Sequence, residues 1–297
     1  MEEKVSKAEL ARRIGISRAS LYYKHKGPKA DEELRQAIEA VMFHNPGYGH
    51  RRVADALKIN RKRALRVMKH FNLKPARRCR TPNKPNDTGK ADAGFSDITR
   101  LFCPTTPNTF WVSDFTFISY QGRFIFLATI LDRFTAEVLG ANVMTNHSAE
   151  LPLGALLQAL KQADLYPLWC HSDQGSEYNS DIFLSVLAKY NIQVSMSPKA
   201  SPWRNGSQES FFGRFKVEFG DPERFETLPE LIEAIYAFIY YYNHERIHSR
   251  FRMPPVKFKN HFVNKQKLTT YKQLTSLPLG EPPHATANSL GYDLSFL

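Results

Sequence analysis

The amino-acid sequence predicts an α/β protein in which a mixed five-stranded sheet with flanking helices follows small units made only of helices. Stretches rich in aromatic and β-branched residues begin near Phe110 and alternate with stretches of helical period. The net charge of +12 is uneven, because residues 1–90 carry 23 Lys and Arg against 9 Asp and Glu, whereas residues 91–297 carry 18 against 20. A basic segment ahead of a nearly neutral body predicts a polyanionic partner such as nucleic acid, although a solvated basic surface would have the same composition.

Cysteine usage and hydropathy exclude other classes of protein. The three cysteines, Cys79, Cys103 and Cys170, form no CxxC pair, so we expect neither a disulfide framework nor a cysteine-rich zinc site. No apolar run approaches the length of a membrane span, and the opening MEEKVSKAEL lacks the apolar core of a signal peptide. We therefore expect a soluble, cytoplasmic protein with no membrane partner.

Residues 1–30 are expected to form a helix-turn-helix-like segment. Ser6 and Glu9 have the spacing of a capping box, in which each side chain bonds to the other residue's amide. Gly15 lies in the break, and Ser17 can cap a second short helix, RASLYYK. Short patterns of this kind are also found in ordinary helical hairpins.

Residues 31–75 are predicted to form a second helix-turn-helix unit. Apolar residues recur with a helical period in DEELRQAIEAVMFH, NPGYG breaks that helix, and Asn60 can cap a final helix, RKRALRVMKHF. The outer face of the final helix is cationic, which suits phosphate contacts or the major groove, although it could also be a solvated surface. The predicted DNA contacts are Arg51, Arg52, Arg61, Lys62, Arg63, Arg66 and Lys69.

Residues 76–100 are polar and contain prolines but no apolar period, so we expect a flexible basic linker. Residues 101–262 are predicted to form the α/β core, and residues 263–297 a polar C-terminal tail. In the core we expect strands at 110–120, 122–132, 136–144, 168–173 and 192–197, and helices at 148–163, 180–190, 205–219 and 228–244. The first three strands should be antiparallel, and the order βββαβαβαα is that of a ribonuclease-H-like sheet.

Three acids occupy unusual places on these elements. Asp114 lies inside the first strand, where a lone buried carboxylate would be costly. Asp173 ends a buried strand, and Glu209 lies on a helix, with thirty-five residues between the two acids. Carboxylates suit Mg²⁺, which takes oxygen ligands, and two such ions can stabilise both the attacking and the leaving oxygen of a phosphodiester. The spacing therefore predicts a metal-dependent site for phosphoryl transfer.

Other acids could replace the third ligand, and nearby residues have simpler roles. Any single acid is more often exposed or salt-bridged, and Glu177, Asp181 and Glu218 could each take the place of Glu209. Asp132 is expected to be a turn acid or an ion-pair partner. We expect the following residues to be structural: Asn205 and Gly206 in the turn before Glu209, and His171 and Ser172 beside Asp173.

The segments WVSDFTFI, HSDQGSEY and SPWRNGSQESFFGRFK resemble the three motifs of the DDE integrase core, which retroviral integrases share with two-reading-frame bacterial insertion-sequence transposases. YYNHERIHSRFRMPPVKF resembles the end of that core in the bacterial proteins, and NPGYGHRRVADAL and RALRVMKHFNLKP resemble the helix-turn-helix before it. The resemblance covers residues 31–262. The His/Cys zinc module of retroviral integrases is absent from the sequence, so the bacterial branch is the better likeness.

The resemblance implies that Asp114, Asp173 and Glu209 are the catalytic, metal-binding triad for two Mg²⁺ ions, for which Mn²⁺ can substitute. It also implies a DNA contact at Lys216, two helical turns after Glu209, although this residue could also be a plain surface lysine. The implied partner is double-stranded DNA, both transposon ends and target, bound by a homo-oligomer. A first-frame helix-turn-helix and zipper protein is a further implied partner, unless the chain is part of a frameshifted fusion.

The function implied is that of a transposase that binds terminal inverted repeats and then cleaves and transfers DNA strands. Two other functions stay open at this point. A DNA-binding regulator with an inactive core would not need the three acids, and a nuclease that only hydrolyses would not join strands. Intact acids at all three positions disfavour the regulator, and the basic N-terminal region disfavours the nuclease.

Overall fold

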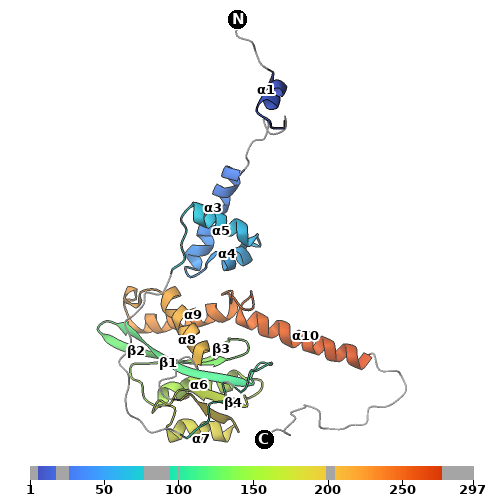
Figure 1. The fold of residues 1–297 in the computed structure, drawn as a ribbon. Helices are drawn as coiled ribbons and strands as arrows, with labels where there is room; N and C mark the ends of the chain where they lie inside the picture. The colour runs from blue at the N-terminus through green and yellow to red at the C-terminus, as the bar shows by residue number, and fades with distance from the viewer. Residues whose placement is uncertain (1–5, 18–26, 77–93, 100, 199–204, 276–297) are drawn as a thin grey trace.

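The computed structural model describes residues 6–17, 27–76, 94–99, 101–198 and 205–275 (Figure 1). The predicted helix RASLYYK, most of the predicted linker, Cys79 and the end of the C-terminal tail lie outside these residues. Within the described ranges, no helix has the length and apolar character needed to cross a bilayer. A short N-terminal helix, α1 (Lys7–Arg13), has Ser6 as its N-cap, and the Ser6 hydroxyl accepts a hydrogen bond from the Glu9 amide.

The three helices α3 (Gly27–His44), α4 (His50–Leu57) and α5 (Arg61–His70) form one small unit. Its core consists of Leu34, Ile38, Tyr48, Val53, Val67 and Met68. Asn60 is the N-cap of α5 as predicted, since its side chain accepts a hydrogen bond from the Lys62 amide. Helix α3 begins at Gly27 rather than at Asp31, so it crosses the expected boundary after residue 30.

The mixed five-stranded sheet predicted from the sequence is present, with strand order β3-β2-β1-β4-β5. The strands are β1 (Phe110–Tyr120), β2 (Arg123–Asp132), β3 (Val138–Met144), β4 (Trp169–Ser172) and β5 (Gln193–Met196). The first three strands pair antiparallel, whereas β1 pairs with β4, and β4 with β5, in parallel. Because β1 and β4 are parallel, they run toward the same end of the sheet, and β1 continues beyond the point where β4 ends at Ser172.

Alternating side chains of the strands bury against helices on both faces of the sheet. Phe110 and Val112 join a core with residues of α8 (Gly206–Glu218) and α9 (Leu228–His244). Trp111 joins a second core with residues of α6 (Glu150–Gln162) and α7 (Asp181–Lys189). Figure 1 shows the helices on the two sides of the sheet. The sheet is therefore the middle of three layers, which explains why β1 and β2 are apolar on both faces.

The helical unit α3–α5 contacts the core at the end of α8 and after α9. The Tyr48 hydroxyl accepts a hydrogen bond from the Ile247 amide at 2.6 Å, and the Tyr241 hydroxyl bonds to Asn45. On the surface, Arg252 forms an ion pair with Asp55 at 2.6 Å. These contacts join residues nearly two hundred positions apart in the chain.

The C-terminal helix α10 (Pro255–Thr275) crosses the boundary expected after residue 262, so the segment following that boundary continues as helix. Phe258 and Phe262 of α10 pack against Phe134, which lies just after β2. Lys259 forms an ion pair with the largely buried Glu137 at 3.0 Å. In Figure 1 the far part of α10 extends away from the core.

Candidate active site

Asp114 lies in β1, beyond the point where β4 ends. The parallel register pairs Phe110 with Trp169 and Val112 with His171. Extended by two residues, this register brings Asp114 level with Asp173. Neighbouring strands lie about 4.8 Å apart, and level residues on parallel strands point to the same face. That face is the one covered by α8, because Val112 belongs to the core beneath it.

Asp173 is exposed and immediately follows β4, where its Oδ1 accepts a hydrogen bond from the Gly175 amide at 3.0 Å. The buried His171 fixes the strand before it, with Nδ1 2.8 Å from Ser195 Oγ and Nε2 2.9 Å from Ser197 Oγ. The Ser172 hydroxyl donates to the Asp173 carbonyl. The structural roles predicted for His171 and Ser172 are thus confirmed.

The buried side chain of Tyr178 contributes a second observation on the two aspartates. Its pKa lies well above the ordinary value, first because of burial and then because of the negative charges of Asp114 and Asp173. The Tyr178 hydroxyl lies 3.3 Å from Ser113 Oγ, on the residue beside Asp114. Both carboxylates therefore lie close enough to one phenol to repel its ionised form, as expected for two acids at one edge of the sheet.

Glu209 is exposed in the first turn of α8, and its neighbours anchor that turn to the sheet. The Asn205 side-chain amide donates to the Ser113 carbonyl at 3.0 Å. The side-chain amide of the fully buried Gln208 donates to the carbonyls of Val112 at 2.7 Å and Thr129 at 3.0 Å. The helix carrying Glu209 is thus fastened to the residues directly before Asp114, and the structural role predicted for Asn205 is confirmed.

Sequence reasoning missed Gln208. A signal was available, since Gln208 precedes Phe211, Phe212 and Phe215 at helical spacing and so belongs to the face that packs on the sheet. A polar residue on such a face must bond to something, and here it takes the backbone carbonyls of two strands.

The three acids lie in one region of the structure, but their side chains do not converge on a common point. Within the described residues, no three His, Cys, Asp or Glu side chains form a group that could hold a metal ion. Asp114 and Asp173 share the sheet edge, and Glu209 stands exposed on the helix anchored beside it. This donor set consists of carboxylate oxygens alone, which is the chemistry that Mg²⁺ prefers.

Glu218 and Asp132 have partners away from this edge of the sheet. The Glu218 carboxylate is 1% exposed and binds Arg246 at 2.6 Å and Arg52 at 3.4 Å, so it is a buried ion-pair acid. Asp132 is almost fully buried, and it accepts hydrogen bonds from Thr135 and from the Asn108 amide. Asp132 is therefore a turn acid, and burial raises its pKa despite these bonds.

Glu177 lies beside Asp173. A Cβ atom added at Gly175 would lie 2.8 Å from Glu177 Oε2 and 3.1 Å from Asp173 Oδ1, so the two carboxylates flank one glycine. Glu177 Oε1 lies 2.7 Å from His147 Nδ1, and the His147 ring stacks on Phe115. Sequence reasoning did not identify His147. By contrast, Asp181 is an exposed residue in the first turn of α7.

Lys216 projects from α8 and is exposed, with its Nζ atom 4.7 Å from the centre of the Phe117 ring of β1. It lies on the same helix as Glu209, seven residues further on, which corresponds to about two turns of one helix face. This position agrees with a contact to a bound polyanion, and that role stays a prediction.

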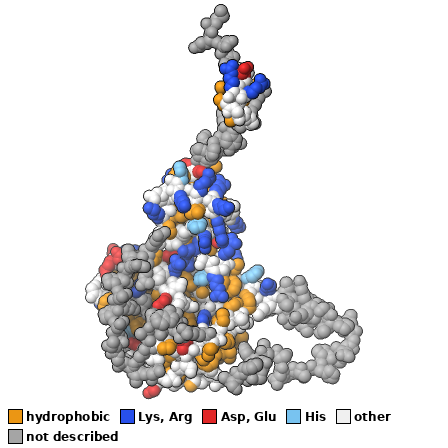
Figure 2. All heavy atoms as spheres, in the orientation of Figure 1, with side chains coloured by type: hydrophobic (Ala, Val, Ile, Leu, Met, Phe, Trp, Pro, Cys, Tyr) orange, Lys and Arg blue, Asp and Glu red, His pale blue; other side chains and the backbone are white. Residues whose placement is uncertain are grey.

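The basic residues predicted to contact DNA divide into two groups. Figure 2 shows Lys and Arg side chains gathered on the α3–α5 unit. The exposed residues are Arg51, Arg61, Lys62, Arg63, Arg66 and Lys69. Of these, Arg61 and Arg66 also form ion pairs with Asp55 and Asp31, yet their side chains remain 46% and 57% exposed. Their DNA contacts stay predictions.

Arg52, which was also predicted to contact DNA, is largely buried, unlike its neighbour Arg51, and its DNA contact stays a prediction. Its side chain is 10% exposed, donates to the Gly47 carbonyl at 2.5 Å and stacks over Tyr48 at 4.7 Å. It also pairs with Glu218 of the core. Sequence alone gave Arg51 and Arg52 equal weight, because only packing on α8 decides which of two adjacent arginines is buried.

Comparison with known proteins agrees with this architecture. Two models described as integrase core domain match residues 104–202 and 190–255. An uncharacterized transposase-like protein of Haemophilus influenzae is 32% identical over 216 residues, covering 72% of this chain and 99% of that protein. The transposase for insertion sequence element IS904 of Lactococcus lactis is 31% identical over 240 residues, covering 73% of this chain and 89% of that protein.

Among solved structures, the catalytic core domain of HTLV-2 integrase in complex with magnesium matches 52% of this chain and 98% of that chain, with 20% identity and a TM-score of 0.44. The sheet and the sequence relatives define the class of protein as a polynucleotidyl transferase with an integrase core domain. Within that class, the chain belongs to the family of insertion-sequence transposases, which act in DNA transposition.

Proposed function

We propose that this transposase binds the terminal inverted repeats of its element and catalyses strand cleavage and strand transfer, with Asp114, Asp173 and Glu209 as the metal-binding triad. The register of β1 and β4 carries the proposal, because it brings two aspartates level at one sheet edge. The anchoring of α8 by Asn205 and Gln208 supports Glu209 as the third carboxylate, because it fastens the helix that carries Glu209 to the strand that carries Asp114.

The three carboxylates would hold two Mg²⁺ ions, or Mn²⁺ in their place. Such ions supply charge neutralisation for the attacking and leaving oxygens of a phosphodiester. Phosphoryl transfer requires no covalent bond to the protein. The role of the chain itself is therefore to hold the reacting DNA strand in line with the phosphodiester that it attacks. Lys216, on the same helix as Glu209, would hold a DNA phosphate beside the triad.

Recognition of the element's ends is assigned to the helical units before the core. Helix α5 presents Arg61, Lys62, Arg63, Arg66 and Lys69 on an exposed face. Such a face can enter a major groove or follow phosphates. Joining two ends requires two copies of the chain on DNA, together with a first-frame helix-turn-helix and zipper protein where one is encoded. The reaction would take place in the bacterial cytoplasm, at the nucleoid.

The test is a strand-transfer assay with DNA carrying the element's terminal repeats and Mg²⁺. Asp114→Asn, Asp173→Asn and Glu209→Gln should each lower cleavage and joining at least about 10³-fold, since metal stabilisation contributes several kcal/mol. Asp181→Asn, an exposed acid on α7, is the matched control and should keep full activity. Each variant should still bind end-bearing DNA.

The same assay distinguishes a transposase from a nuclease. Strand hydrolysis without joining would support a nuclease in place of a transposase. Full activity of the three triad variants would overturn the assignment of the site. Equal binding of terminal-repeat DNA and unrelated DNA of the same length would overturn specific recognition of the ends.

A further inference from the structure

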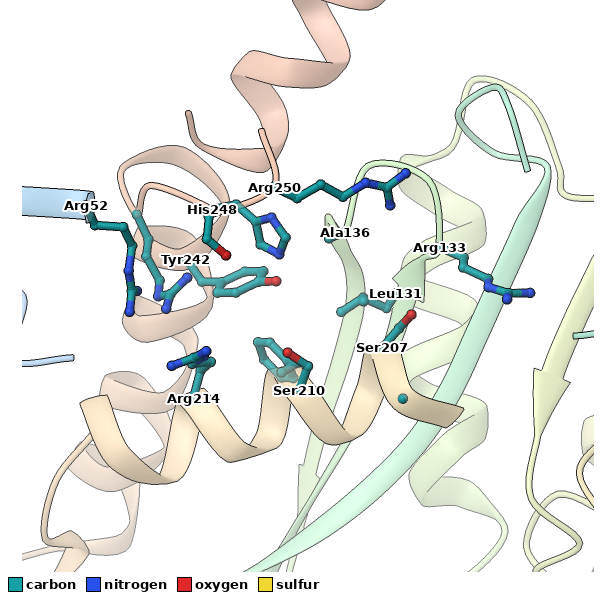
Figure 3. Close-up of a pocket in the computed structure, with 14 residues that line it drawn as sticks. Arg52, Leu131, Arg133, Ala136, Ser207, Ser210, Arg214, Tyr242, His248 and Arg250 are labelled. Carbon is teal, nitrogen blue, oxygen red and sulfur yellow. The ribbon is translucent and has the colours of Figure 1, made fainter. Parts of the chain in front are cut away.

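A cavity of about 280 Å³ lies where α8 meets the end of β2, α4 and the segment after α9, and core residues Leu131, Phe211 and Tyr242 contribute to its lining. Figure 3 shows Ser207, Ser210 and Arg214 entering it from α8, and His248 and Arg250 from the segment after α9. Ser207, Ser210 and Arg214 occupy one face of α8 at i, i+3 and i+7. Glu209 and Lys216 lie on the opposite face of α8, about half a turn around the helix axis, so α8 lies between this cavity and the proposed triad.

The cavity carries an excess of positive charge. Arg52 and Arg246 share the single carboxylate of Glu218. Arg214 and Arg250 are exposed, and neither forms an ion pair within the described part of the chain. Four guanidinium groups around one carboxylate leave a site whose field favours an anion.

His248 responds to this field. Burial and the charges of Arg246, Arg250, Arg52 and Arg214 lower its pKa to about 4, so the ring is neutral at physiological pH. Its Nδ1 atom is buried and has no hydrogen-bond partner among the described residues. A buried polar atom without a partner costs free energy, so a bound group that bonded to this nitrogen would be favoured.

Arg133 also borders the cavity but is engaged elsewhere. Its guanidinium donates to the carbonyls of Phe102 at 3.1 Å and Thr99 at 3.0 Å. Figure 3 shows the guanidinium of Arg133 directed away from the other side chains. The groups left to bind an anion are therefore Arg214, Arg250, His248 and the hydroxyls of Ser207, Ser210 and Ser249.

We propose that this cavity binds a single phosphate of the DNA backbone and so holds the strand between the α3–α5 unit and the catalytic edge. The inference rests on the proposed function, since it assigns how the same enzyme holds its DNA. The volume lies at the lower end of small-molecule pockets, about 300–1,000 Å³, which suits one charged group better than a whole nucleotide. Arg is well suited to such a site because its planar fork can donate two bonds to one phosphate.

The test combines variants with DNA in which one backbone phosphate at a time is replaced by a neutral methylphosphonate. Binding is measured without divalent metal, so that no strand chemistry is required. In the wild type, one position should weaken binding on the order of tenfold, the effect of losing a charge-assisted contact. The double variant Arg214→Gln, Arg250→Gln should lose this sensitivity at that position and bind natural DNA equally weakly.

Salt dependence distinguishes a shared pocket from scattered contacts. If both arginines hold one phosphate, the double variant should lower the slope of log K against log salt by about one, whereas two separate phosphates would give about two. Arg123→Gln, an exposed arginine at the start of β2, is the matched control and should leave the slope unchanged. Arg214→Lys, which keeps the positive charge, should bind DNA more tightly than Arg214→Gln but less tightly than the wild type.

A free anion is the competing source of the phosphate. If inorganic phosphate raises the melting temperature of the wild type but not of the double variant, and no methylphosphonate position depends on Arg214 or Arg250, the DNA assignment is overturned. A wild type that shows the predicted position yet joins no strands would instead overturn the proposed function and leave the phosphate pocket standing.

Discussion

At the scale of single residues, Gln208 anchors the helix that carries Glu209 of the proposed active site. It is fully buried, donates to the carbonyls of Val112 and Thr129, and accepts from the Thr129 hydroxyl at 3.0 Å. Three bonds from one amide fasten the first turn of α8 across two strands. The position of the adjacent Glu209 relative to Asp114 follows from these bonds.

Gln208→Ala should therefore lower both stability and strand transfer. The substitution removes the side-chain partner of two strand carbonyls and a threonine hydroxyl, at a cost of about 1–3 kcal/mol for lost buried hydrogen bonds. Urea unfolding and the strand-transfer assay measure the two effects. Gln162→Ala, at the exposed end of α6, is the control. Unchanged strand transfer by a destabilised Gln208→Ala variant would show that this anchor does not position Glu209.

His248 makes stability depend on pH. Its pKa in the folded chain is about 4, whereas an unfolded histidine titrates near about 6.5. Above the higher value neither state holds the proton, so His248 contributes no pH dependence. Between the two values the unfolded chain binds more protons, and stability falls as pH falls. The charged groups facing the ring are Arg52, Arg214, Arg246 and Arg250, together with Glu218, which pairs with Arg246.

We expect His248 to account for a loss of about 2 kcal/mol in the free energy of unfolding between pH 7 and pH 5. His248→Gln should be less sensitive to this change of pH than the wild type, as measured by urea unfolding at both values. His261→Gln, on an exposed position of α10, should behave as the wild type. Equal pH sensitivity of His248→Gln and the wild type would contradict the prediction.

At the scale of elements, β3 and α6 approach each other closely because Gly140 has no side chain. A Cβ atom at this position would overlap the Ala155 carbonyl and lie 2.7 Å from the Ala159 backbone nitrogen. Both obstacles include backbone, which cannot rotate away. The small residues Gly140, Ala155 and Ala159 thus set the distance between the sheet and the helix that covers it.

Gly140→Ala should separate α6 from β3 and destabilise the chain by about 1–3 kcal/mol, the usual cost of overpacking. Thermal unfolding measures the effect. Gly206→Ala is the matched control, because a Cβ atom there meets no atom within 4 Å in the described chain. If both variants melt at the same temperature, β3 and α6 are not held at the distance that the structure indicates.

At the scale of the whole molecule, charge and catalysis are divided along the chain. The basic residues concentrate before residue 91, and the acids of the triad follow in the core. The buried Glu218 links the two parts, since it pairs with Arg246 of the core and Arg52 of α4. Loss of one partner of a buried ion pair strongly destabilises a protein, so Glu218 fastens the α3–α5 unit to the helix that carries Glu209.

The double variant Lys62→Gln, Lys69→Gln should lower the slope of log K against log salt by about two, as each lysine that neutralises a phosphate contributes about 0.9. The slope is measured by titrating terminal-repeat DNA at several salt concentrations. Lys161→Gln with Lys189→Gln removes equal charge from the exposed ends of α6 and α7 and is the control. Equal slopes for the two double variants would mean that α5 does not contact the DNA.

Local patterns in the sequence determined the elements of this protein. Period-two and helical patterns predicted the five strands and the helices of the core, and the βββαβαβαα order is the one observed. Asn60 and Ser6 predicted helix starts because a cap bonds within its own turn. The acids at 114, 173 and 209 were candidates because of the strand or helix around each of them, and the resemblance to the DDE core favoured Glu209 over the other acids as the third member.

Only the tertiary structure decided which distant residues meet. The burial of Arg52 beside Glu218, the anchoring of α8 by Gln208 and the arginine-lined cavity around His248 each join segments far apart in the chain. Such contacts leave no periodic trace in the sequence, because their free energy arises from the packing of whole elements against each other. A run of charged residues likewise does not indicate which side chain is buried. The burial of Arg52 rather than Arg51 depends on Glu218, which the fold places beside Arg52.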